Sequence, residues 1–157
     1  MLFSRALFAF LVLPGVVAFL LPLAVIAPDR PYDLRGLVLV VPGIGLLSWC
    51  VREFYVAGKG TLAPWSPPKY LVVSGPYRVS RNPMYVAVLL ILVGWAAGFR
   101  SRSLANYAAV MAVAFYLRVV LFEEPWLRDT HGDRWRDYKA RVPRWVGPGR
   151  RSRGSDA

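Results

Sequence analysis

The sequence of 157 residues contains one cysteine, Cys50, and one histidine, His131. A single cysteine excludes an internal disulfide framework and a cysteine-rich metal site. A single histidine leaves too few imidazoles for a histidine metal site, so no metal is expected. Cys50 stands in an apolar run, which is typical of packing within a membrane span, whereas His131 stands in a polar stretch typical of a surface or interfacial position.

Acidic residues are also scarce. Nine Asp and Glu stand against 20 Lys and Arg, which gives a formal net charge of +11. Such a balance is found in nucleic-acid-binding proteins. However, half of the 20 cations lie from Arg118 onward, at or beyond the end of the last apolar run, where attraction to anionic lipid accounts for them. We therefore expect a lipid bilayer, and no nucleic acid, as a partner.

Hydrophobic residues are abundant, at 56% of the chain against about 45 to 50% in soluble domains. They are concentrated in four long runs, and one bilayer span needs about 20 apolar residues. The pattern predicts an all-α integral membrane protein with four transmembrane helices in two hairpins, at 6–27, 36–55, 83–99 and 103–122. The four spans leave no room for a soluble catalytic domain, so any chemistry must be built from span ends and loops.

The first run is read as a span and not as a cleaved signal peptide, because it is long and no small-residue cleavage site follows it. A long loop rich in turn formers joins the second and third spans, whereas three residues, 100–102, join the third and fourth in a tight hairpin. An amphipathic interfacial helix is predicted at 125–141, with its basic face toward lipid headgroups and its Trp and Tyr at the membrane boundary. These parts form a single domain over 1–146, followed by a disordered basic tail at 147–157.

Charge indicates the orientation. With four spans, 16 of the 20 Lys and Arg fall on the side that holds both termini and the long loop. The positive-inside rule places that side in the cytoplasm. The compact length suggests a bacterial inner membrane.

Two acidic residues, Glu123 and Glu124, stand where the fourth span leaves the bilayer, with Arg118 one to two helical turns earlier. Ionisable groups at the end of a membrane span are energetically costly, so their presence calls for a structural or functional explanation. One interpretation is a span terminator with an intrahelical ion pair. The other is that one carboxylate enters a pocket while its neighbour is paired elsewhere.

A second polar cluster, 75–85, reads Gly-Pro-Tyr-Arg-Val-Ser-Arg-Asn-Pro-Met-Tyr and leads directly into the third span. Pro83 suits the first turn of a helix and Asn82 is a good N-cap. Helix initiation does not explain the Gly-Pro-Tyr turn ahead of Arg81. In the second span, Gly43 and Gly45 are typical of close helix packing and are by themselves a weak ligand signal.

Taken in order, these motifs resemble the integral-membrane methyltransferases that include isoprenylcysteine carboxyl methyltransferase and phosphatidylethanolamine N-methyltransferase. The resemblance covers roughly residues 36–146. Gly43-x-Gly45 and the Gly60-Thr61 pair match the phospholipid branch, as does the four-span layout. Asn82 departs from the isoprenylcysteine enzymes, which carry histidine there, so a prenylcysteine substrate is placed in doubt.

The resemblance implies S-adenosylmethionine as cofactor and a lipid-like or hydrophobic methyl acceptor at the cytoplasmic face, either a phospholipid amine or an isoprenylcysteine-type carboxylate. For an amine, Glu123 or Glu124 would accept the proton; for an anionic substrate, Arg118 would position it. The implied catalytic residues are Glu123, Glu124 and Arg118. The implied cofactor-binding residues are Gly43, Gly45, Tyr77, Arg81, Asn82, Pro83, Met84, Tyr85, Glu123 and Glu124.

Two other functions remain open on the sequence. A membrane sterol or enone reductase using NADPH has a related turn, but the paired Glu and the short length favour the methyltransferase. A non-enzymatic small membrane protein is the other alternative. Against it, the Gly-Pro-Tyr turn, the Arg-Asn-Pro-Met-Tyr segment and the Glu pair all fall on the same predicted side of the membrane. The sequence does not identify the methyl acceptor, the cofactor-binding Glu or the oligomeric state.

Overall fold

The computed structural model describes residues 11–26, 31–57 and 70–147, and all regular structure within them is helical, as predicted. The π-helical segments are η1 (Leu11–Leu20), η2 (Pro22–Ile26) and η5 (Val119–Glu123), and the short 3₁₀ turns are η3 (Leu34–Gly36) and η4 (Gly75–Arg78). The α-helices are α2 (Leu37–Val56), α3 (Pro83–Gly98), α4 (Arg102–Arg118) and α5 (Glu124–Arg141).

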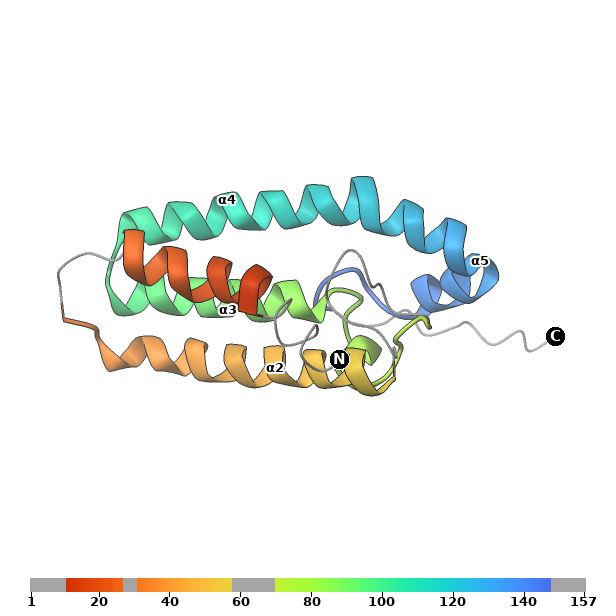
Figure 1. The fold of residues 1–157 in the computed structure, drawn as a ribbon, viewed down its shortest axis with the longest axis horizontal. Helices are drawn as coiled ribbons and strands as arrows, with labels where there is room; N and C mark the ends of the chain where they lie inside the picture. Colours follow the sequence, from red (N-terminus) through yellow and green to blue (C-terminus); the bar gives the residue numbers. More distant parts are fainter. Residues whose placement is uncertain (1–10, 27–30, 58–69, 148–157) are drawn as a thin grey trace.

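The helices α2, α3 and α4 lie along the long axis of the molecule, and each runs in the opposite direction to the one before it. The segment η1–η2 lies against α3 and α4 (Figure 1). At one end, Asp33 meets Arg100: its backbone N–H donates to the Gly98 carbonyl at 2.8 Å and its carboxylate pairs with the guanidinium at 3.0 Å. At the other end, α4 continues through η5 into α5, beside the segment that precedes α3. The predicted hairpin at 100–102 is confirmed.

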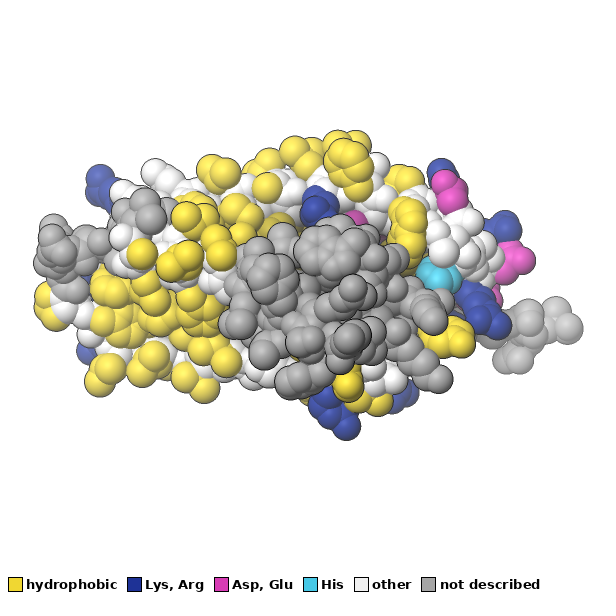
Figure 2. All heavy atoms as spheres, in the orientation of Figure 1, with side chains coloured by type: hydrophobic (Ala, Val, Ile, Leu, Met, Phe, Trp, Pro, Cys, Tyr) yellow, Lys and Arg dark blue, Asp and Glu magenta, His cyan; other side chains and the backbone are white. Residues whose placement is uncertain are grey.

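Among the described residues, two helical stretches are long and apolar enough to cross a membrane, Leu34–Val56 and Arg102–Arg141. Two further apolar helices, Gly15–Ala24 and Pro83–Gly98, are shorter. Hydrophobic side chains dominate the visible half of the molecule away from α5, and charged side chains gather at and beside α5 (Figure 2). These features agree with a membrane protein, while the four-span topology and the single domain over 1–146 stay predictions.

Glycines bring α2 and α3 close together. A Cβ added at Gly43 would lie 2.7 Å from Ile91 Cγ1, and one added at Gly94 would lie 2.5 Å from Val40 Cγ2. Each glycine thus receives a branched side chain of the facing helix, which is how small residues allow membrane helices to pack closely. This packing fixes the position of α3, whose first turn carries the second polar cluster.

The first described helix is held by side chains that replace a missing backbone donor. Pro22 has no N–H, so it leaves unpaired the carbonyl of Ala18 in an α-helical pattern or of Val17 in a π-helical one. The Trp95 indole donates to the Ala18 carbonyl at 2.9 Å, and the Tyr107 hydroxyl donates to the Val17 carbonyl at 3.2 Å. Both carbonyls are thereby satisfied where no water is available.

We expect Trp95→Phe to lower stability in detergent by about 1 to 3 kcal/mol, because it leaves the buried Ala18 carbonyl without a donor. The Pro22→Ala background supplies a backbone N–H, so the same exchange there should cost less. Thermal unfolding of the four proteins of this cycle measures the difference. An equal loss in both backgrounds would mean that the indole acts only by its size.

The helix predicted at 125–141 is present as α5 but is kinked at Gly132, which has φ +51 and ψ −119. Its orientation also differs in part from the expectation that its Trp and Tyr face the membrane boundary. Trp135 and Tyr138 are 3% and 4% exposed, and with Val142 they pack against Leu71 and Leu127. The aromatic residues in the second half of α5 are therefore buried against the protein, whereas Trp126 in the first half is 42% exposed. Periodicity predicts an apolar face, but it does not say whether lipid or protein covers that face.

Candidate functional site

Residues of the polar cluster 75–85 and of the Glu pair meet at the α5 end of the molecule. Arg81 precedes α3, the two glutamates lie at the junction of η5 and α5, and the segment 142–146 returns from α5 to the start of α3. The contacts among them divide into a buried ion cluster around Glu124 and a more open group around Glu123.

Glu124 is enclosed by two arginines. Arg81 donates to one of its oxygens at 2.9 Å, and Arg144 donates to both through Nε and Nη2, at 2.8 and 2.9 Å. Burial opposes ionisation of Glu124, but the hydrogen bond from Arg144 and the two guanidinium charges prevail and lower the pKa of the carboxyl. Glu124 is therefore ionised near neutral pH and acts as an acceptor for arginine.

Glu123 points to different partners. It accepts hydrogen bonds from the Tyr85 hydroxyl and from Arg118 Nε, the latter at 2.9 Å, and Arg118 Nε also lies 3.1 Å from the Tyr85 oxygen. The Tyr85 ring stacks on Phe115 with centroids 4.6 Å apart. The Glu123 side chain is 30% exposed, against 12% for Glu124, so Glu123 is the more accessible carboxylate of the pair.

The π-helical turn η5 makes this arrangement possible. Arg118 and Glu123 are five residues apart, and in a regular α-helix such residues do not share a face. A π-turn pairs residues at this spacing and is frequently found at functional sites. The predicted intrahelical ion pair is confirmed between Arg118 and Glu123, while Glu124 is paired elsewhere.

The Arg-Asn-Pro turn is fixed by the segment that follows α5. Asn82 occupies the N-cap position of α3, but its side chain makes no cap hydrogen bond. Instead its amide donates to the Arg144 carbonyl at 2.9 Å, and the Arg81 backbone N–H donates to the Pro143 carbonyl at 2.9 Å. Asn82 thus holds the predicted N-cap position without the side-chain hydrogen bond of a cap, and its amide is engaged with the returning chain. Pro83 does begin the helix, as predicted.

The Gly-Pro-Tyr turn is clamped to α2 by Glu53, a residue for which the sequence suggested no role. Ser74 Oγ donates to one Glu53 oxygen at 2.5 Å, and Trp49 Nε1 and Arg52 donate to the other at 3.3 and 3.2 Å. Gly75 has φ +56 and lies directly against Glu53. This network sets the path of the chain into Tyr77.

Tyr77 lies inside the protein. It is 5% exposed, packs with Cys50 and Val72, and its ring centroid lies 5.5 Å from that of Phe54. Burial raises the pKa of its hydroxyl well above the ordinary value, so the hydroxyl stays protonated. Packing therefore accounts for the buried position of Tyr77, and its contact with the cofactor stays a prediction.

The remaining predicted cofactor residues differ in burial and in their distance from the ion cluster. Gly43 is buried against α3, whereas a Cβ at Gly45 would meet nothing within 4 Å. Helix rise of 1.5 Å per residue places Gly43 about 15 Å along α2 from Glu53 and the turn that it clamps. Met84 is half-buried between two apolar clusters. Gly60 and Thr61 lie outside the described residues.

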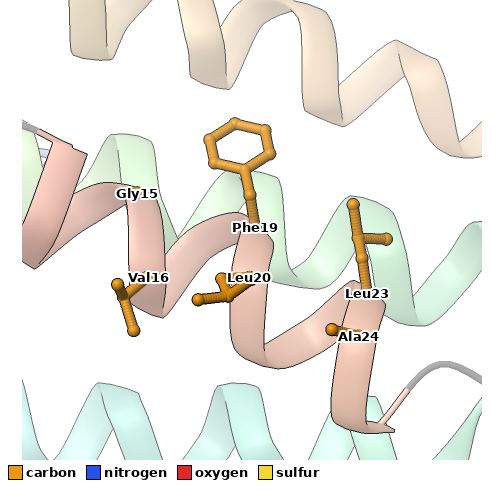
Figure 3. Close-up of a pocket in the computed structure, with 6 residues that line it drawn as sticks. All are labelled: Gly15, Val16, Phe19, Leu20, Leu23 and Ala24. Atoms are coloured by element: carbon orange, nitrogen blue, oxygen red, sulfur yellow. The ribbon is translucent and has the colours of Figure 1, made fainter.

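An apolar groove of about 490 Å³ runs along η1 and η2. Figure 3 shows its lining, which consists only of apolar side chains and glycine: Gly15, Val16, Phe19, Leu20, Leu23 and Ala24. These residues offer no side-chain partner for a charged ligand. The described lining therefore offers a ligand apolar contacts alone.

Sequence reasoning also missed two residues of the ion cluster, Arg144 and Trp135. The Arg81 guanidinium carbon lies 5.3 Å from the Trp135 ring centroid. The Arg81 side chain is 8% exposed, and its Nε has no hydrogen-bond partner among the described residues. No motif marks these contacts, because they depend on how the chain folds back after α5.

Comparison with known proteins bears on this arrangement. A family model described as phospholipid methyltransferase matches residues 33–134, which is more than half of the chain. No significant match is found among curated proteins or among solved structures. The matched segment contains the Gly-Pro-Tyr turn, the Arg-Asn-Pro-Met-Tyr segment and the Glu pair, whereas Arg144 lies beyond it.

Proposed function

Because the chain belongs to the phospholipid methyltransferase family, we propose that it transfers a methyl group from S-adenosylmethionine to a lipid-like acceptor at the α5 end of the bundle. The observation that carries the proposal is the meeting of Tyr85, Arg118 and Glu123 beside the Arg81–Glu124 cluster. Family membership supports methyl transfer and gives no support to the reductase alternative. The predicted orientation makes this end cytoplasmic.

The side chains present suit this cofactor. Adenosylmethionine supplies a methyl group on a sulfonium and carries an ammonium, a carboxylate and a ribose diol. Glu123 offers a part-exposed carboxylate for an ammonium or a diol. The orphaned Nε of Arg81 is a donor that a carboxylate would satisfy. The exposed guanidinium of Arg118 is held by Glu123 and Tyr85, so its direction is fixed.

We assign the acceptor chemistry to Glu123 and Arg118. A phospholipid amine is protonated near neutral pH and loses a proton before it attacks, and Glu123 is the accessible carboxylate that accepts this proton. Glu124 is a poorer proton acceptor, because Arg81 and Arg144 occupy its oxygens and stabilise its ionised form. Arg118, whose side chain is 56% exposed, positions an anionic group of the acceptor. Alignment and exclusion of water then supply much of the rate enhancement.

Ligand-dependent unfolding tests the cofactor. A ligand that binds the folded protein raises its melting temperature. We expect S-adenosylhomocysteine to stabilise the purified protein in detergent and NADPH to leave it unchanged. Stabilisation by NADPH alone would favour a reductase, and no stabilisation by either ligand would refute the cofactor assignment.

A further inference from the structure

The segment that follows α5 reaches both halves of the proposed site. The Arg144 side chain forms a two-pronged contact with Glu124, while its backbone carbonyl accepts hydrogen bonds from Asn82 Nδ2 at 2.9 Å and from Ser80 Oγ at 3.4 Å. The neighbouring Pro143 carbonyl accepts from the Arg81 N–H. One residue thereby joins the turn before α3 to the start of α5.

Arg81, within the turn, also bonds Glu124, whereas two arginines of α5, Arg128 and Arg136, make no such link. Arg136 pairs with Asp133 one turn away on α5, and Arg128 pairs with its neighbour Asp129. Both arginines are largely exposed, and ion pairs of that kind contribute little to stability. The Arg144 side chain is 30% exposed and that of Glu124 only 12%, so their contact is less hydrated. In such a setting the paired hydrogen bonds of a planar guanidinium to a carboxylate are strong and directional.

Fixing Glu124 also fixes the neighbouring carboxylate. Glu123 and Glu124 are adjacent at the η5–α5 junction and point to different partners, so a rotation of this turn would move both. Arg81 is held between Glu124 and Trp135, four residues before Tyr85, which donates to Glu123. Loss of the Arg144 contact would therefore loosen the Glu123 group without removing any group from it.

We propose that Arg144 is a positioning residue that latches the turn at Ser80–Asn82 to Glu124 and so sets the geometry of the methyl-transfer site. The inference rests on the proposed function for its effect on cofactor binding. The part of the proposal in which Arg144 holds the turn at Ser80–Asn82 to Glu124 does not depend on any ligand.

The test compares Arg144→Ala, Arg144→Lys and the control Arg136→Ala in the full-length protein in detergent. We expect Arg144→Ala to weaken S-adenosylhomocysteine binding about tenfold in calorimetry, the effect of losing one charge-assisted hydrogen-bond pair. Lysine cannot form the fork and should restore the affinity only in part. Arg136→Ala should bind as the unaltered protein does. Equal affinity in Arg144→Ala and Arg136→Ala would overturn the proposed effect on the site.

A double exchange separates positioning from general loss of stability. In the Glu124→Gln background, Arg144→Ala should weaken binding further by much less than tenfold, because its partner is already altered. A full and independent tenfold loss in that background would show that Arg144 does not act through Glu124.

Amide hydrogen exchange tests the effect of Arg144 on the turn before α3 even if the protein does not bind S-adenosylhomocysteine. The Arg81 amide donates to the Pro143 carbonyl, so it should exchange faster in Arg144→Ala than in Arg136→Ala, while the amide of Ile91 in the middle of α3 stays unchanged. An unchanged rate at Arg81 would refute the latch. Absence of ligand binding by the unaltered protein would instead count against the proposed function.

Discussion

Replacing Glu123 by Gln is expected to lower methyl transfer to an amine by about 100- to 10,000-fold, the range for loss of a general base. Glutamine keeps the size of the side chain but accepts no proton. The folded protein should tolerate the exchange, because Glu123 is part-exposed and its partner Arg118 is mostly exposed. Ion pairs of this kind are worth about 0 to 1 kcal/mol. Initial rates with methyl-labelled adenosylmethionine, together with the melting temperature, measure both effects.

Glu124→Gln is the matched control, because it makes the same chemical change at the adjacent position. It weakens three hydrogen bonds from Arg81 and Arg144 and leaves two guanidinium groups without a counter-charge. Breaking such a buried cluster is strongly destabilising. We therefore expect the melting temperature to fall further in Glu124→Gln than in Glu123→Gln. The reverse pattern, with full activity in Glu123→Gln, would exchange the roles given to the two carboxylates.

Gly75→Ala is expected to destabilise the protein by about 2 to 4 kcal/mol, as the sum of left-handed backbone strain and overpacking. Gly75 has φ +56, and an added Cβ would lie 2.8 Å from Glu53 Cγ and 2.9 Å from its Cδ. Glu53 cannot move away without losing its contacts with Ser74 and Trp49. The turn would shift instead, and with it the chain that leads to Arg81. Thermal unfolding and cofactor affinity are the two measurements.

Gly132 provides the control, because it has φ +51 while a Cβ there would meet nothing within 4 Å. Gly132 has ψ −119, at a kink within α5, so Gly132→Ala should cost the backbone strain alone, about 1 to 3 kcal/mol. Gly75→Asn separates the two terms at the turn, since asparagine tolerates the left-handed conformation but keeps the Cβ. Equal losses in Gly75→Ala and Gly132→Ala would show that contact with Glu53 does not matter.

The sequence predicted the helical class, the hairpin at 100–102 and the residues that begin α3, because these follow from hydrophobic run length and from proline at a helix start. It did not predict the orientation of α5, because Trp135 and Tyr138 have the same periodicity whether lipid or protein covers them. The close approach at Gly43 was expected, but its partner Ile91 was not, because a glycine pattern does not specify the facing residue.

For the site, the sequence singled out the Glu pair, Arg118 and the segment 81–85. It did not distinguish Glu123 from Glu124, because the distinction comes from the π-turn and from Arg144, which is 20 residues from Glu124 along the chain. Glu53 was overlooked for a similar reason: its partner Ser74 is 21 residues away. Local patterns therefore identified reactive residues, whereas the residues that hold them depend on tertiary contacts.

The most direct test of methyl transfer by this site uses the purified protein in vesicles that contain phosphatidylethanolamine, with methyl-labelled adenosylmethionine added outside. We expect label in the extracted lipid with the unaltered protein and almost none with Glu123→Gln. The same amount of labelled lipid from both proteins, or none from the unaltered protein, would contradict this expectation.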